Sequence, residues 1–101
     1  MTWQDLSRHR LVVYSTTWCP DCHRLKRVFQ GRGVAFTEID IDADAAAAER
    51  LQKATGRTAI PCVQIDDTGM VRGWHEGEPG RFSETRFLEE AEALLKGVGK
   101  A

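Results

Sequence analysis

The chain has 101 residues, of which 42% are hydrophobic and 29% charged, and its formal net charge is -1. This length predicts a single domain over residues 1–101. Binding to nucleic acid or to an anionic membrane requires a strongly basic surface, which a net charge of -1 does not indicate, so we expect neither partner. The first apolar run, residues 11–14, is too short for a signal peptide or a membrane span, which predicts a cytoplasmic location.

The first half of the chain predicts a strand, a helix and a second strand. Residues 11–15 form an apolar, partly β-branched run that is typical of a strand buried on both faces. A helix is expected from Pro20 to about Arg32, because proline suits the first helical position, and Cys19 then becomes the N-cap. Residues 34–41 follow as a second strand. The buried stripe of the helix is expected to hold Cys22, Leu25, Val28 and Phe29.

The second half predicts a helix, two strands and a last helix. The sequence Asp67-Thr68-Gly69 favours a tight turn, so the two strands should pair as an antiparallel hairpin. The order βαβαββα indicates an α/β fold, with a four-stranded mixed sheet flanked by three helices on its two faces. The first helix of this half is capped by Asp42 or Asp44 and ends at Gly56, with Ala47, Leu51 and Ala54 facing the core. The two strands are expected at residues 62–66 and 71–75, and the last helix runs from Ser83 to Gly97.

Two cysteines separated by two residues lie at the start of the first long helix. Unpaired N–H groups and the positive end of the helix dipole stabilise a thiolate there, which favours Cys19 as the attacking sulfur. Cys22 lies one turn further on the buried stripe and is expected to resolve the mixed disulfide. Pro20 restricts the loop so that the two sulfurs stay close. The pattern predicts a dithiol redox site without a bound metal, and the alternative is an iron-sulfur or zinc site on the same cysteines.

Three segments together resemble the glutaredoxin family, whose members have the thioredoxin fold. The resemblance implies a thiol-disulfide oxidoreductase that acts on disulfide-containing proteins, and we expect a monomer without a tightly bound cofactor. It also implies that the Ile60-Pro61 bond is cis, packed against the cysteine pair, with the Ile60 backbone facing the substrate. The segments are Tyr14-Ser-Thr-Thr-Trp-Cys-Pro-Asp-Cys-His-Arg-Leu-Lys26, Gly33-Val-Ala-Phe-Thr-Glu-Ile-Asp40 and Gly56-Arg-Thr-Ala-Ile-Pro-Cys-Val63.

Two departures from the glutathione-using members concern the electron donor. Thr16 stands where those members often carry lysine, and residues 72–77 replace their Gly-Gly-Cys-Asp-like segment. We therefore favour a different low-molecular-weight thiol, or a flavoprotein reductase of the thioredoxin type, over glutathione.

Other side chains near the cysteines allow two interpretations each. Trp18 either faces the substrate or packs against the fold, and Trp74 either forms a substrate rim or packs on the hairpin. Cys62 is expected to be a small core residue, although it could also lie near the site. We expect solvated surface positions for the basic residues that follow Cys22, which are His23, Arg24, Lys26 and Arg27.

Overall fold

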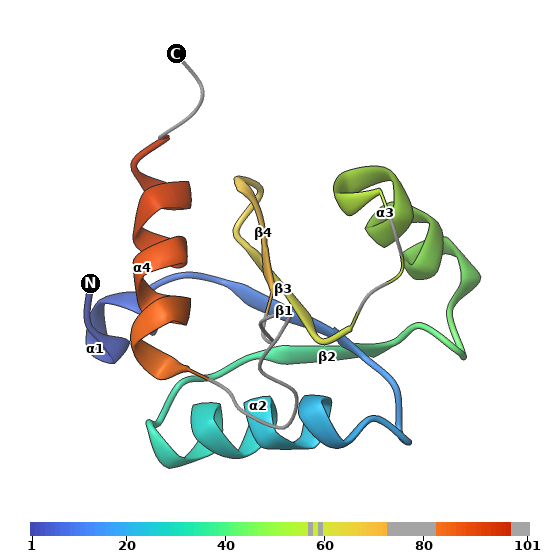
Figure 1. Ribbon diagram of the computed structural model, residues 1–101, viewed down its shortest axis with the longest axis horizontal. Coiled ribbons are helices and arrows are strands. Elements are labelled where there is room, and N and C mark those ends of the chain that lie inside the picture. The colour runs from blue at the N-terminus through green and yellow to red at the C-terminus, as the bar shows by residue number, and fades with distance from the viewer. Residues whose placement is uncertain (57, 59, 73–82, 98–101) are drawn as a thin grey trace.

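A four-stranded sheet in the order β2-β1-β3-β4 forms the centre of the fold in the computed structural model (Figure 1). The structure describes residues 1–56, 58, 60–72 and 83–97. Within them, the predicted order βαβαββα is confirmed, with one additional short helix at the start. The elements are α1 (Trp3–Leu6), β1 (Leu11–Ser15), α2 (Pro20–Gly31), β2 (Thr37–Asp40), α3 (Ala45–Thr55), β3 (Cys62–Ile65), β4 (Gly69–Arg72) and α4 (Glu84–Leu95).

The sheet is mixed, as predicted. The β1 strand pairs in parallel with β2 and antiparallel with β3, and β3 continues into the antiparallel β4. Tyr14 near the end of β1 lies opposite Ile39 on one side and Cys62 on the other. The central position of β1 explains its nearly continuous burial, because helices cover both faces of a strand in the middle of such a sheet.

Alternate residues of the strands supply two separate hydrophobic clusters. The α2 and α4 helices cover one face of the sheet, and α3 covers the other (Figure 1). Val13 belongs to the first cluster and its neighbour Tyr14 to the second, as the two-residue repeat of a strand requires. No helix in the described part of the chain is long and apolar enough to cross a bilayer.

The N-terminal helix α1 was not predicted. Thr2 caps it, and the Thr2 hydroxyl and the Asp5 carboxylate each accept a hydrogen bond from the other residue's backbone N–H. This capping box is readable in the sequence, but four residues are too few to show an apolar repeat. Trp3 of this helix packs against Phe29 and Phe87 in the first cluster.

The predicted strand boundaries were partly wrong. The β2 strand begins only at Thr37, because Val34 and Phe36 pack into the first cluster from the connection that precedes it. The hairpin turn lies one residue earlier than expected, since Asp66 adopts the left-handed conformation with φ of 50° and Gly69 already pairs with Ile65. The predicted extension of the fourth strand to residue 75 lies outside the described residues.

The predicted helix caps were correct, but one predicted core position was wrong. Asp44 caps α3, Gly56 ends it in the left-handed conformation, and Ser83 caps α4. Ala47 and Leu51 are buried as expected, whereas Ala54 is exposed. Ala54 instead lines an open hollow of about 390 Å³ between the end of α3 and the β3–β4 hairpin.

Candidate active site

Cys19 lies at the junction where β1 ends and α2 begins. It has an extended backbone and serves as the N-cap of α2, and Pro20 takes the first helical position, as the sequence predicts. The Cys22 N–H donates a hydrogen bond to the Cys19 sulfur over 3.2 Å. The helix start therefore brings Cys22 one turn above Cys19 and gives the Cys19 sulfur a backbone donor, which stabilises negative charge on it.

The two cysteines differ in accessibility. Cys19 is 6% exposed, whereas Cys22 is 0% exposed on the buried side of α2, together with Leu25 and Phe29. Burial of the Cys22 thiol and its hydrogen bond to the Cys19 sulfur raise the pKa of Cys22 to about 12. A hydrogen bond from the Thr16 backbone and the charge of Lys26 act in the opposite direction on this pKa. Both residues are buried, and of the pair only Cys19 keeps any exposed surface.

Alkylation of the reduced, folded protein with iodoacetamide tests this asymmetry. We expect one added group per chain near pH 8, on Cys19, because Cys22 is 0% exposed and its pKa, raised to about 12, keeps its thiol protonated at that pH. Unfolding in denaturant should allow all three cysteines to react. Mass spectrometry of intact protein and of its peptides measures both results. Equal alkylation rates of Cys19 and Cys22 under native conditions would contradict the prediction.

A charged network lies on the β2 side of α2, one turn beyond Cys22. The Lys26 ammonium donates to Glu38 Oε2 over 2.6 Å, and the buried Ser15 hydroxyl donates to the same oxygen over 2.7 Å. These two hydrogen bonds, Lys26 first, lower the pKa of the Glu38 carboxyl. The prediction of Lys26 as a merely solvated residue was therefore wrong: its side chain is 16% exposed and paired.

The Ile60-Pro61 peptide bond is cis, which confirms the expectation from the resemblance. Pro61 is fully buried, and Ile60 is half-buried against the second cluster. Because Tyr14 lies opposite Cys62, Pro61 enters the sheet at the same end at which β1 leaves it toward Cys19. Their contact with a substrate remains a prediction.

Trp18, immediately before Cys19, projects into solvent. Its side chain is 68% exposed, so the alternative that it packs inside the fold was wrong. The indole Nε1–H donates to Asp42 Oδ2 over 2.8 Å. Asp42 follows β2 at the edge of the sheet where the parallel strands β1 and β2 both end. Asp42 was predicted only as a possible helix cap, and its contact with Trp18 was missed, although residues that follow parallel neighbouring strands meet at one edge of a sheet.

The remaining candidates fall into two groups. Cys62 is 1% exposed in the second cluster, where burial raises the pKa of its thiol to about 11, so its prediction as a core residue is confirmed. Trp74 and most of the segment 72–77 lie outside the described residues. Among the residues that the structure does describe, no group of three or more His, Cys, Asp or Glu side chains is placed to hold a metal ion.

Comparison with known proteins assigns the family. A sequence model of the glutaredoxin family matches residues 11–70, which include both cysteines and the cis-proline. The chain belongs to the glutaredoxin family. Glutaredoxin 3 of Escherichia coli K12 is 43% identical over 54 residues, which cover 54% of this chain and 65% of that protein. The match therefore spans just under two thirds of the length of this relative.

Solved structures support the same fold. The thioredoxin-like protein BC3987 is similar with a TM-score of 0.60 and 28% identity, covering 84% of this chain and 99% of its own. The buckwheat glutaredoxin-glutathione complex is similar with a TM-score of 0.52 and 30% identity, covering 67% of this chain and 66% of its own. The predicted thioredoxin fold is confirmed.

Proposed function

We propose that the chain is a thiol-disulfide oxidoreductase in which Cys19 attacks a substrate disulfide and Cys22 releases the reduced product. The observation that carries the proposal is the asymmetric pair: the Cys22 N–H donates to the Cys19 sulfur over 3.2 Å, and of the two residues only Cys19 keeps any exposed surface, 6% against 0%. Membership of the glutaredoxin family and the match over residues 11–70 support this chemistry.

The proposed reaction has two exchange steps. The Cys19 thiolate attacks one sulfur of the substrate disulfide, forms a mixed disulfide and releases the other substrate sulfur as a thiolate. Cys22 then loses its proton and attacks the Cys19 sulfur, so that the Cys19-Cys22 disulfide forms and the second substrate sulfur leaves. The substrate gains two electrons and two protons, and the protein loses them. Proximity of the two sulfurs favours the second step over escape of the mixed disulfide.

The substrate is proposed to be a disulfide-containing protein that docks on the surface around Cys19. Trp18 provides an exposed aromatic surface, and the Ile60 backbone lies directly before the cis-proline at the same end of the sheet. Pro20 shapes the loop between the cysteines, and Trp74 is proposed as a further residue that contacts the substrate. We propose that the protein acts in the cytoplasm and as a monomer.

The electron donor is proposed to be a low-molecular-weight thiol other than glutathione, or a flavoprotein reductase of the thioredoxin type. Thr16 supports this choice, because it is 1% exposed and offers no cation where many glutathione-using members of the family carry lysine. The buckwheat relative was solved as a glutathione complex, so glutathione is the natural competitor in the test.

The experiment compares how fast different donors reduce the oxidised protein. Glutathione with its reductase, alternative thiols such as mycothiol or bacillithiol, and thioredoxin reductase are supplied separately, and protein thiols are counted over time. We expect slow reduction by glutathione and fast reduction by one of the others. Fast turnover with glutathione alone would overturn the donor assignment. Failure of the reduced protein to cleave any disulfide, including 2-hydroxyethyl disulfide, would overturn the proposed function itself.

A further inference from the structure

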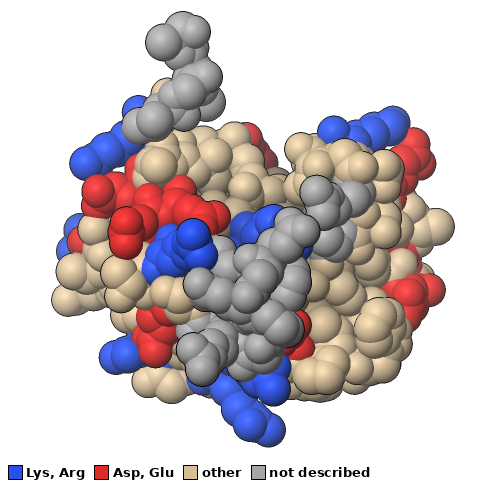
Figure 2. All heavy atoms as spheres, viewed as in Figure 1, with Lys and Arg blue, Asp and Glu red and all other residues tan. Residues whose placement is uncertain are grey.

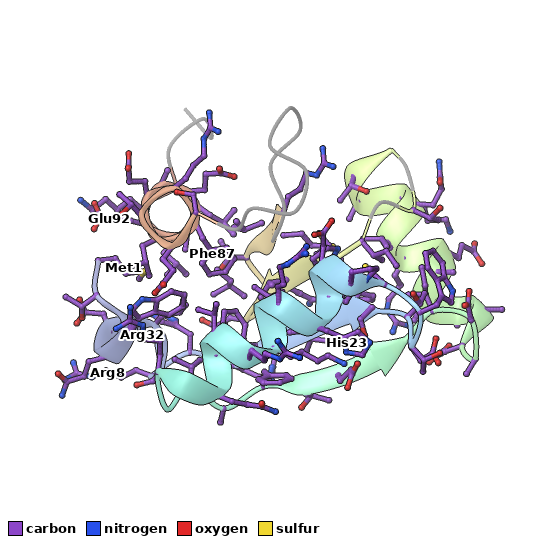
Figure 3. The ribbon with its side chains drawn as sticks, turned by 60° about the horizontal axis from the view of Figure 1, so that its bottom comes forward. Met1, Arg8, His23, Arg32, Phe87 and Glu92 are labelled. Atoms are coloured by element: carbon purple, nitrogen blue, oxygen red, sulfur yellow. The ribbon has the colours of Figure 1, made fainter. Side chains whose placement is uncertain are left out.

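A groove of about 310 Å³ lies beside Cys19, along the exposed side of the first turns of α2. It is lined by Trp18, Pro20, His23, Arg24 and Arg27. A second hollow of about 290 Å³, toward β2, shares His23 and Arg27 with it. Figure 3 shows His23 on the side of α2 that faces β2, whereas Phe87 points into the core from α4. The reactive cysteine therefore lies at one end of a continuous surface along α2.

This groove is basic although the chain as a whole has a formal net charge of -1. No carboxylate of the residues that the structure describes lines it. Asp21, the acidic residue nearest to it in sequence, is paired with Arg24 over 2.7 Å. The Arg27 side chain makes no ion pair or hydrogen bond to any residue that the structure describes. His23 Nε2 lies 2.9 Å from the Thr17 carbonyl oxygen. Figure 2 shows Lys and Arg side chains along the lower edge of the molecule, where α2 lies in Figure 1.

The groove also has an apolar anchor. Trp18 is the large hydrophobic side chain that the described part of the chain leaves exposed, and its hydrogen bond to Asp42 holds the indole at the mouth of the groove. Exposed aromatic and arginine side chains are enriched at protein interfaces, where they supply most of the binding free energy. Arginines are common on a solvent-exposed helix face and would need no further explanation by themselves. An exposed tryptophan held in place beside them does need one.

We propose that this groove binds an acidic segment of the substrate protein next to its disulfide. Carboxylates of that segment pair with Arg27 and with Arg24, and an apolar side chain packs on Trp18, so that the disulfide approaches Cys19. The inference rests on the proposed function, and it adds a substrate class to it: proteins whose reactive cysteine is flanked by Asp or Glu. Charge complementarity of this kind acts mainly on the association rate and weakens with added salt.

Matched peptide disulfides test the proposal. Two peptides share one cysteine and one aromatic residue and differ only in three flanking glutamates or three glutamines. At low ionic strength, the reduced protein should cleave the acidic disulfide about tenfold faster than the neutral one. Arg27→Glu should bring this ratio to about one or below, and Arg27→Gln should give an intermediate ratio. Arg8→Glu is the matched control, because Arg8 is an exposed arginine just beyond α1, at the left edge of the molecule and well away from His23 (Figure 3).

The outcomes separate the two proposals. If wild-type protein cleaves both peptides equally, or if Arg27→Glu and Arg8→Glu change the ratio equally, the acidic-segment inference fails and the oxidoreductase proposal stands. If the wild-type protein cleaves neither peptide nor 2-hydroxyethyl disulfide, the proposed function fails. A ratio that falls toward one at 0.5 M salt, and that only the Arg27 variants alter, supports the inference.

Discussion

Replacement of Cys19 by serine is expected to reduce disulfide cleavage to the uncatalysed background, whereas Cys22→Ser is expected to accumulate a mixed disulfide with the substrate. A serine hydroxyl at position 19 cannot ionise near neutral pH, so the attacking sulfur is lost altogether. In Cys22→Ser, the exposed edge of Cys19 and its position at the start of α2 remain, so the first exchange step survives. Only the intramolecular attack that releases the product is removed.

Intact-mass spectrometry after incubation with a peptide disulfide measures the difference. Cys22→Ser should gain the mass of one peptide on Cys19, Cys19→Ser should gain none, and wild-type protein should gain none because it resolves the adduct. Cys62→Ala is the matched control, since Cys62 is 1% exposed in the second cluster and takes no part in the proposed steps. Equal inactivity of the two active-site variants, with no adduct on either, would disprove the division of labour between the cysteines.

The parts of this site that depend on local sequence could be predicted. Proline at the first turn of a helix and a cysteine before it set the start of α2, and the apolar stripe placed Cys22 inside. The cis state of Ile60-Pro61 could not be obtained from the residues alone, because most X-Pro bonds are trans. It followed from the resemblance of the surrounding segment to the glutaredoxin family.

The parts that depend on strand pairing could not be predicted. Trp18 meets Asp42, and Lys26 meets Glu38, only because β1 and β2 run in parallel and bring these segments together. No local repeat in the sequence encodes these two pairs. The predicted start of β2 at Val34 was wrong for a related reason. Val34 is buried because the connection before β2 packs on the core, and it does not pair with a strand.

The substitution Phe29→Ala is expected to cause a large loss in the free energy of unfolding. Phe29 is 0% exposed, and its ring lies 5.7 Å from Trp3, 5.6 Å from Phe36 and 5.6 Å from Phe87, centroid to centroid. It therefore connects α2 to α1, to the segment before β2 and to α4. Loss of the ring removes buried apolar area and leaves a cavity, which costs about 3–5 kcal/mol of the free energy of unfolding. A domain of this size has only about 5–15 kcal/mol in total.

Urea denaturation followed by circular dichroism measures the free energy of unfolding of the variant. The matched control is Phe36→Ala, which deletes the same ring from the same cluster at a half-buried position. Because Phe36 buries less apolar area on folding than Phe29 does, we expect a clearly smaller loss in the free energy of unfolding. A loss below about 1 kcal/mol for Phe29→Ala would mean that its neighbours collapse into the space, and the connecting role of the ring would be wrong.

Phe29→Ala should also change how fast the buried cysteines react. Cys22 lies on the buried stripe of α2 with Phe29, so a reagent reaches its thiol only when the structure opens. A loss of about 3 kcal/mol raises the unfolded fraction by about 100-fold. Iodoacetamide should therefore modify Cys22 and Cys62 about 100-fold faster in Phe29→Ala than in the wild type, while the rate at the accessible Cys19 changes little. If Cys22 stays as protected as in the wild type despite the lower stability, the prediction that unfolding controls its exposure is wrong.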